Sequence, residues 1–389
     1  MIFKKSILSL FILLPFIGLA QLKLSTSLQG GYEYNIFKNP DSLQRSQEIN
    51  QDLLLQSAYF SAMGLDTDWK KRWKKHELRL ETEANTQYFP TFNTANLLQM
   101  DATQGYSYKL FKKIKLYQKT NFRTKNRGGN NAADEVFALP NSYRFAELLA
   151  GFEWKANKQW KLKVELARLQ RIYSETETSA LRYRQKSLKL YTRYRPKNES
   201  KLASMEWTGR WRNRWYTRER FVDLDTEDWD EADWEAFEEA EFWDENIEEH
   251  DMTYWYKQLA LKFDLDDNWS VKPSLDYTIR HSFENANLRF RQIRPALGLV
   301  YETDKTTFKT SISYTHRLNT DLIPSKAETA LVYEYLRLTC SIEQQLAKRL
   351  DLIAGINATK RMSNFEGLTS RAYRSYNYFR VLLGLKYNF

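Results

Sequence analysis

The last stretch of the chain reads YRSYNYFRVLLGLKYNF, from Tyr373 to Phe389, and this stretch decides the fold class. Counting back from the carboxylate, apolar side chains recur at every second position: Phe389, Tyr387, Leu385, Leu383, Val381 and Phe379. Polar or small residues stand between them, at Asn388, Lys386, Gly384 and Arg380. A strand that crosses a bilayer needs roughly nine to eleven tilted residues with one face toward lipid. The alternation therefore predicts a membrane-spanning strand.

A chain that ends in phenylalanine after such an alternation resembles the closing strand of Gram-negative outer-membrane β-barrels. In that family the pattern is the signal read by the barrel-assembly machinery, and the matching positions here are Leu383, Leu385, Tyr387 and Phe389. The resemblance implies a porin-like protein of the cell outer membrane. It also implies the barrel-assembly machinery, outer-membrane lipid and lipopolysaccharide as partners.

The other end of the chain carries an export signal. Lys4 and Lys5 precede an apolar run from Ser6 to Ile17, which is typical of a secretory signal peptide. We expect residues 1–20 to be removed before Gln21, leaving 21–389 as the mature domain. Position 21 is not cysteine, which argues against a lipoprotein anchor, and no internal apolar run is as long as a membrane helix. The single cysteine, Cys340, can form no internal disulfide.

Between these ends the sequence repeats long alternating runs separated by polar connections. We predict an all-β fold, a single antiparallel up-and-down barrel of about 16 strands (about 14–18). The expected strands are Leu22–Tyr34, Leu53–Asp66, His76–Tyr88, Leu97–Leu110, Ile114–Thr124, Tyr143–Trp154, Trp160–Tyr173, Leu181–Arg195, Leu202–Arg218, Thr253–Leu265, Ser270–Ser282, Leu288–Tyr301, Thr307–Leu318, Ala330–Glu343, Leu350–Arg361 and Tyr373–Phe389. A soluble β-sandwich is the alternative, but its strands average five or six residues.

The connections alternate in length, as a barrel with both termini in the periplasm requires. Short turns are expected at Lys70–Arg72, Phe111–Lys113, Ala156–Lys158, Asp266–Asn268 and Ala347–Arg349. These should face the periplasm. The longer connections, which include 125–141 and 221–252, should face the exterior.

The parity of the last strand sorts the other strands into a lipid face and a lumen face. Although the formal net charge is +10, the Lys and Arg residues are spread along strands rather than clustered, so nucleic-acid binding is not indicated. On the predicted lumen face, one wall is basic. Its members are Lys189, Arg193, Arg195, Arg210, Arg212, Arg214, Lys262, Arg280 and Arg294. Elsewhere the lumen mixes signs, as at Glu77, Arg79, Glu81 and Glu83.

An acidic insert at residues 222–251 joins two strands of this wall and contains no Lys or Arg. Trp229, Ala232, Ala236, Ala240, Trp243 and Ile247 recur at spacings of three and four, which would give a helix one apolar stripe. We expect the insert to fold over or into the lumen as a constriction or plug. An exposed acidic loop held by divalent cations at the outer leaflet is the alternative. The residues assigned to this loop are Asp225, Asp228, Asp230, Asp233, Glu238, Glu239, Glu241, Trp229, Trp234 and Trp243.

The function predicted from these features is a passive channel for small, anionic solutes or oligosaccharides, because rows of arginine lower the entry barrier for anions. The basic lumen resembles that of exporters of acidic polysaccharides such as alginate, on charge alone. Lumenal charge pairs that only stiffen the barrel are the competing interpretation.

Two other function classes remain open. A platform protein of an outer-membrane assembly or secretion complex would dock a protein partner on the acidic insert. A hydrolase would need a histidine beside a serine or carboxylate, but His281 and His316 are expected to face lipid near the outer rim. His281 and Ser282 should point to opposite faces. The sequence shows no catalytic motif, metal-ligand cluster or cofactor-binding loop, so none is predicted. We expect no plug domain before the first strand, which argues against a TonB-dependent transporter.

Overall fold

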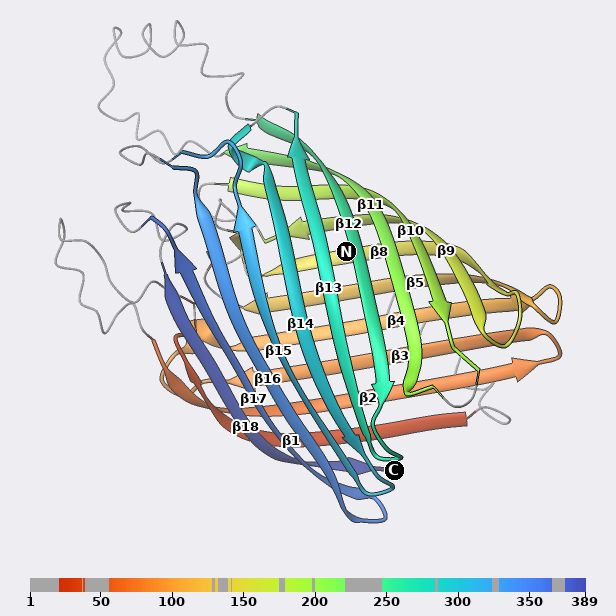
Figure 1. Cartoon of the computed structure of the whole chain (residues 1–389). Coiled ribbons are helices and arrows are strands. Elements are labelled where there is room, and N and C mark those ends of the chain that lie inside the picture. Colours follow the sequence, from red (N-terminus) through yellow and green to blue (C-terminus); the bar gives the residue numbers. More distant parts are fainter. Residues whose placement is uncertain are drawn as a thin grey trace, which may run out of the picture.

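The computed structural model is a closed antiparallel barrel of sixteen strands in which each strand pairs with its neighbours in the chain and β1 pairs with β18 (Figure 1). It describes residues 21–36, 38, 56–127, 130–131, 139–140, 142–174, 179–197, 200–220, 247–283, 286–323, 329–365 and 375–389. The barrel strands are β1 (Gln21–Tyr34), β2 (Ala58–Trp73), β3 (His76–Tyr88), β4 (Leu97–Lys109), β5 (Ile114–Arg127), β8 (Tyr143–Lys155), β9 (Trp160–Tyr173), β10 (Ser179–Tyr194), β11 (Leu202–Arg220), β12 (Ile247–Asp264), β13 (Trp269–Ser282), β14 (Phe290–Glu302), β15 (Thr306–Leu318), β16 (Val332–Ala347), β17 (Leu350–Ser363) and β18 (Tyr376–Asn388). The predicted fold class and strand number are confirmed.

Four short elements lie in the connections. Strands β6 (Asn130–Asn131) and β7 (Leu139–Pro140) form a separate two-stranded sheet, and η2 (Asn93–Ala95) and η3 (Ala286–Leu288) are single 3-10 turns. Within the described residues, no helix is long and apolar enough to cross a membrane.

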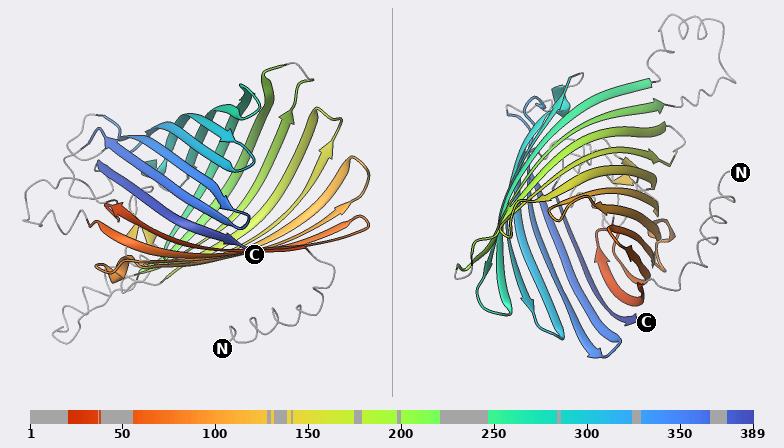
Figure 2. Two further views of the ribbon diagram at one scale, coloured as in Figure 1. Left: turned by 90° about the horizontal axis from the view of Figure 1, so that it is seen from below. Right: turned by 90° about the vertical axis from the view of Figure 1, so that its right-hand side faces the viewer.

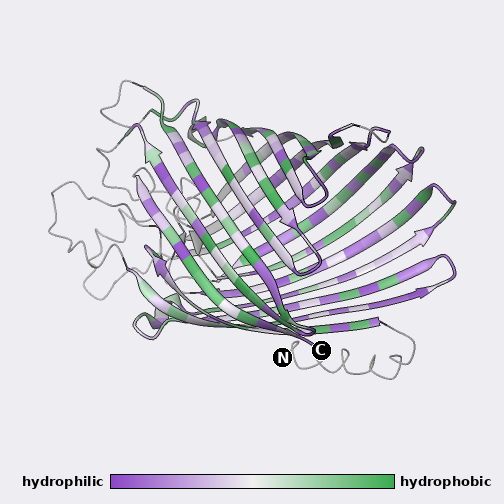
Figure 3. Ribbon diagram, turned by 60° about the horizontal axis from the view of Figure 1, so that its bottom comes forward, coloured by the Kyte–Doolittle hydropathy of each residue, from purple (hydrophilic) through white to green (hydrophobic). Residues whose placement is uncertain are grey.

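Side chains alternate between the two faces of every strand, because successive residues of a pleated strand point in opposite directions. Hydrophilic and hydrophobic residues accordingly alternate along the strands in Figure 3. The registers carry this parity around the whole ring: Leu385 is paired with Leu28, and Leu28 with Met63. On the opposite side, Leu188 is paired with both Leu166 and Trp211. The parity read from the last strand is therefore the parity of the whole barrel.

The barrel has two unlike ends, seen from below and from the side in Figure 2. We call them the turn end, where Phe389 and the short hairpin connections lie, and the loop end, where the longer connections lie. One predicted turn is wrong. Lys70–Arg72 belongs to β2, and the hairpin turns at Lys74 and Lys75, where Lys74 has a positive φ of 50°. Arg72 forms a salt bridge with Glu77 across the hairpin, so the basic residues extend the ladder.

The seam between β1 and β18 closes the ring. Ten residue pairs run from Ser25 opposite Asn388 to Tyr34 opposite Phe379. The backbone N–H of Phe389 donates a 2.9 Å hydrogen bond to the carbonyl oxygen of Leu24, and Asn35 donates through Nδ2 to the carbonyl oxygen of Asn377 at 2.8 Å. The last residue of the chain is thus held directly by the first strand.

The buried apolar core consists of three clusters that line the inner face of the barrel at the loop end. The largest joins Leu169, Tyr173, Leu181, Tyr183, Tyr216, Met252, Tyr254 and Leu288. A second joins Ile36, Ala58, Phe60, Phe89 and Ala95, and a third joins Leu322, Leu331, Tyr333 and Tyr335. Phe89, Ala95, Leu288, Leu322 and Leu331 come from the connections. Several loop-end connections therefore fold inward and narrow the mouth.

Candidate functional site

The outer face fixes the environment of the barrel. Leu383, Leu385, Tyr387 and Phe389 point outward, with exposed fractions of 58, 45, 40 and 62%. Exposed apolar side chains continue around the ring at the same parity, as at Leu166 and Leu297, and such a continuous band is stable only against lipid. The chain is an outer-membrane β-barrel. How the closing strand is read during assembly stays a prediction.

The predicted basic wall lies on the inner face of β10–β14, and several of its members are held by neighbours. Lys189 pairs with Glu165 at 3.0 Å, and Lys262 pairs with Asp264 at 2.8 Å. Arg294 donates through Nε to the buried carboxylate of Asp276 at 2.7 Å. Arg280 is buried and donates to the carbonyl oxygen of Leu288, which anchors η3 to the wall. These contacts therefore hold neighbouring side chains and η3 in place, in addition to fixing the positions of the positive charges.

Positive charges lie closest together at the centre of the basic wall. Arg210, Arg212 and Arg214 occupy alternate positions of β11 and so share the inner face. Arg214 donates to Oε1 of Gln185 at 3.0 and 3.1 Å. In the neighbouring strand, Arg193 lies opposite Glu206, and Arg195 follows the end of β10.

Several inward-facing arginines keep a buried donor without an acceptor in the described part of the chain. The Nε atoms of Arg171, Arg193, Arg212 and Arg380 are solvent-inaccessible and form no hydrogen bond. A buried donor left unpaired costs about 1–3 kcal/mol, more for a charged group. These N–H groups can donate to an oxygen of an anion, since the guanidinium fork matches carboxylate and phosphate.

The sequence prediction missed the most extended feature of the lumen, which we call the arginine–aromatic belt. It consists of inward-facing arginines in the loop-end half of eight strands, each stacked on one or more aromatic rings. The belt arginines are Arg127, Arg171, Arg214, Arg280, Arg317, Arg337, Arg361 and Arg380.

Belt distances are those of cation–π contacts, within about 6 Å of the ring centroid. The guanidinium carbon of Arg171 lies 4.3 Å from the ring of Tyr143, and that of Arg214 lies 4.5 Å from the ring of Tyr183. The guanidinium of Arg380 lies 4.6 Å from the ring of Phe60. Aromatic faces hold the guanidinium planes in place without cancelling their charge.

Among the described residues, the carboxylate of Glu33 enters the belt. Glu33 is 2% exposed, accepts a hydrogen bond from Gln87 at 3.1 Å, and lies 3.5 Å from Nη2 of Arg127. The hydroxyl of Tyr378 donates to the same carboxylate at 3.3 Å. This corner of the belt is therefore neutralised.

A sequence signal for the belt exists. Arginine and tyrosine recur two residues apart near the loop end of their strands, as in Arg171–Tyr173, Arg214–Tyr216 and Tyr335–Arg337. Two residues apart on a strand means the same face, so each pair predicts a stacked contact on one side of the barrel.

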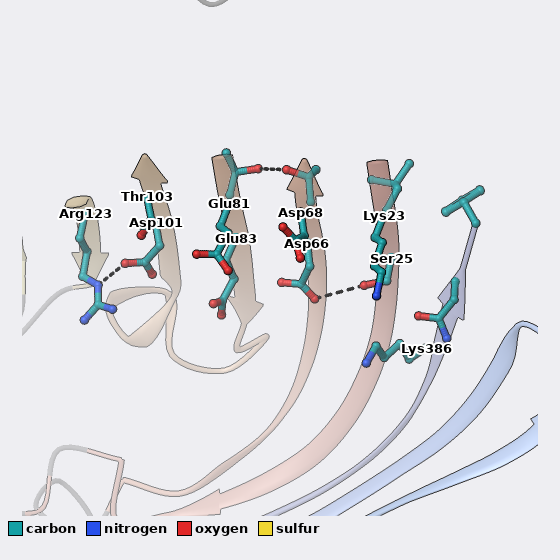
Figure 4. A pocket seen from close by; sticks show the side chains of 15 residues that line it. Lys23, Ser25, Asp66, Asp68, Glu81, Glu83, Asp101, Thr103, Arg123 and Lys386 are labelled. Carbon is teal, nitrogen blue, oxygen red and sulfur yellow. Dashed lines mark hydrogen bonds and ion pairs between the residues drawn. The ribbon is translucent and has the colours of Figure 1, made fainter. Parts of the chain in front are cut away.

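The wall opposite β10–β14 carries a row of carboxylates on the turn-end side of the belt. A lumen cavity of about 840 Å³ is lined there by Asp66, Asp68, Glu81, Glu83 and Asp101, with Lys23, Arg123 and Lys386 at its edges (Figure 4). Arg123 pairs with Asp101, and Ser25 donates to Asp66 at 3.4 Å. The lumen thus differs in charge between its two sides.

The histidines face as predicted. His281 and His316 lie on the outward face, opposite Thr253 and Ile293, whereas Ser282 is fully buried. His316 lies 3.5 Å from Glu334, whose carboxylate also accepts a hydrogen bond from Tyr314. Among the described ranges, no group of three or more His, Cys, Asp or Glu side chains is arranged to hold a metal ion.

The acidic insert lies mostly outside the described residues. β12 begins at Ile247, so the last five residues of the predicted insert belong to the barrel wall and Ile247 is not part of a helix. The loop residues from Asp225 to Trp243, and the signal peptide at 1–20, fall outside the described ranges. The plug and the docking surface therefore stay predictions.

Comparison with known proteins gives similarity in fold only. No protein-family model and no curated protein matches the sequence. Among solved structures, the outer membrane channel DcaP of Acinetobacter baumannii is similar over 95% of this chain and 98% of its own, with 12% identity and a TM-score of 0.47. OprD of Pseudomonas aeruginosa is similar over 95% of each chain, with 10% identity and a TM-score of 0.45. A bacterial polysaccharide outer membrane secretin gives 10% identity over 94% of this chain and 98% of its own, with a TM-score of 0.43. At these values the likenesses carry no functional argument.

Proposed function

We propose that the protein is a passive outer-membrane channel for small anionic solutes, including acidic oligosaccharides, which it selects at the arginine–aromatic belt. The observation that carries the proposal is the belt together with the buried, unpaired Nε donors of Arg171 and Arg380 within it. Cations held on aromatic faces around a mouth attract anions and lower the barrier to their entry.

The chemistry of the belt favours carboxylates on sugars over simple halides. A guanidinium can bind both oxygens of a carboxylate, and the neighbouring tyrosine rings offer flat apolar faces and hydroxyl groups. A solute that carries both a ring and a carboxylate would use both kinds of contact. The acidic cavity on the turn-end side of the belt would then weaken binding and favour release from the belt.

Reversal potentials in a potassium chloride gradient test the proposal. We expect the wild-type channel to prefer the anion, and the variant R171Q/R380Q to lose several-fold in anion-to-cation permeability ratio. K360Q is the matched control, because Lys360 is exposed on the outward face of β17 opposite Leu336. A wild-type channel that prefers cations would reject the proposed selectivity.

The acidic insert belongs to the same proposal as a constriction or plug. Its carboxylates would bind the basic wall and compete with anionic solutes. Because β12 begins at Ile247, deletion of residues 225–245 leaves the strand intact. Single-channel conductance should rise in this deletion variant, and unchanged conductance would refute the plug.

A further inference from the structure

Exposed positive charges gather on one side of the turn end. Four neighbouring hairpins, which join β2 to β3, β4 to β5, β8 to β9 and β10 to β11, have basic tips. The left view of Figure 2 shows these tips in a row along one edge. We call their cations the basic rim. Its members are Lys74, Lys75, Lys112, Lys113, Lys158, Arg195, Lys197 and Lys201.

The basic rim is not balanced by acidic side chains. All eight of its side chains are exposed, and within the described residues none of them forms an ion pair or a hydrogen bond. The sequence of the four tips holds a single acid, Glu199. The three hairpin tips on the other side of the turn end are balanced, with the cations Lys305, Lys348 and Arg349 and the acids Asp266, Asp267 and Asp304. The turn end is therefore positive on one side only.

Contact with the bilayer does not explain this asymmetry. Trp73 directly precedes Lys74, and Trp160 follows Lys158 by two residues. Both tryptophans are exposed and mark the membrane interface, so the basic rim lies at or just beyond it. Lipid headgroups surround a barrel on all sides, and lysines that only anchored it would be spread around the whole end. The one-sided charge therefore indicates an anionic partner in the aqueous space beyond the interface.

Backbone hydrogen bonds hold the tips of neighbouring hairpins at fixed positions. The N–H of Lys109 donates to the carbonyl oxygen of Lys75 at 2.9 Å, and that of Lys155 donates to the carbonyl oxygen of Lys113 at 2.8 Å. A third bond, of 2.9 Å, joins the end of β10 to the carbonyl oxygen of Gln159. With strands about 4.8 Å apart, the four tips span roughly 30 Å. The basic rim is thus one preorganised edge.

Cations continue from the basic rim into the lumen. On the inner face of β9 and β10, Arg193 lies opposite Lys161, and four residues away along β10 Lys189 lies opposite Arg210. Lys161 and Lys189 each pair with a glutamate, whereas the buried Nε of Arg193 has no acceptor in the described part of the chain. An anion held at the basic rim therefore meets further cations in the direction of the belt.

We propose that the basic rim binds a linear glycan that carries carboxylates along its length, and holds it at the periplasmic mouth of the channel. This rests on the proposed function, in which anionic sugars are the solutes selected at the belt. Lysine is a flexible point charge without a fixed partner geometry, which suits charges repeated along a polymer. A chain that reaches several tips at once gains affinity by multivalency, and a single sugar does not.

Binding of a fluorescent galacturonate decamer to the folded full-chain barrel in phosphatidylcholine nanodiscs tests the assignment. The variant K75Q/K112Q/K158Q removes one cation from each of three tips and should bind the decamer on the order of 10-fold more weakly than wild type. The control K305Q/K348Q/R349Q removes the same charge from the opposite hairpins and should bind like wild type. The galacturonate monomer should compete poorly, and added salt should weaken decamer binding. Heat-modifiable migration on gels confirms that each variant is folded.

Four results would overturn the proposal. Equal weakening in the control would mean that only net charge matters, and an unchanged affinity in the rim variant would place the decamer elsewhere. Equally tight binding of poly-L-glutamate would indicate an acidic polypeptide rather than a glycan. Loss of decamer binding in phosphatidylglycerol nanodiscs would show that lipid headgroups occupy the basic rim. Reversal potentials measure the belt and decamer binding measures the rim, so either proposal can fail without the other.

Discussion

Replacement of Arg212 by methionine should stabilise the barrel while weakening its preference for anions. Arg212 lies between Arg210 and Arg214 on the inner face of β11, and its Nε is buried without an acceptor. Each like-charged neighbour, about 6.7 Å away along the strand, costs between about 0.6 kcal/mol at a water-like dielectric and about 2.5 kcal/mol at ε near 20. The unpaired donor adds about 1–3 kcal/mol.

Taken at their lower ends, the two repulsions and the unpaired donor together predict that Arg212→Met raises the free energy of unfolding by about 2 kcal/mol. Methionine has a similar length but no charge. Urea unfolding in phospholipid vesicles, followed by tryptophan fluorescence, measures the free energy of unfolding. Reversal potentials of the same variant should shift toward the cation. A loss of stability of 1 kcal/mol or more would show that Arg212 is paired in the native protein, and would refute the reasoning.

Three further predictions follow from neighbouring contacts. Arg294→Met should lower the free energy of unfolding by about 3–5 kcal/mol in the same urea experiment, because Asp276 is 2% exposed and would lose its cation. The double variant D276N/R294M should recover much of this loss, and an unchanged free energy of unfolding in R294M would disprove the pairing. Gly31→Ala should prevent closure of the barrel, since a Cβ there would overlap the carbonyl oxygen of Val381 and lie 2.7 Å from the Phe60 ring. In the control Gly298→Ala the added Cβ meets no atom nearer than 3.6 Å, and equal yields of heat-modifiable barrel from both variants would contradict this prediction. Deletion of Phe389 should lower the yield of folded barrel, because it removes the hydrogen bond to Leu24 and the terminal aromatic side chain. The control F283A changes an exposed aromatic side chain at the loop end, and equal yields from the two variants would argue against a role of Phe389 in assembly.

The period-two pattern predicted most of the fold because the lipid face leaves little choice. Leu383, Leu385 and Tyr387 can point only outward, and every other strand inherits its parity through the registers. The basic wall followed from the same parity. Arg210, Arg212 and Arg214 lie on the inner face for this reason alone.

What the pattern could not predict depends on pairing across strands. The basic residues Lys70 and Arg72 were interpreted as a turn, yet both form salt bridges with Glu77 and extend β2. The belt was missed because parity says which face a residue takes, and not that Arg171 meets Tyr143 from another strand. Nor does a strand pattern show which loop residues, such as Phe89 and Leu331, fold back into the mouth.

The seam between β1 and β18 has a consequence for the order of folding. The hydrogen bond from Asn35 to Asn377 joins residues 342 positions apart, so the first strand to leave the export channel must wait for the last. Until then both strands present unpaired backbone edges, which in water invite pairing with other chains. Productive folding therefore depends on keeping the β1 edge covered until Phe389 arrives, and mutations that weaken the seam should act on aggregation before they act on transport.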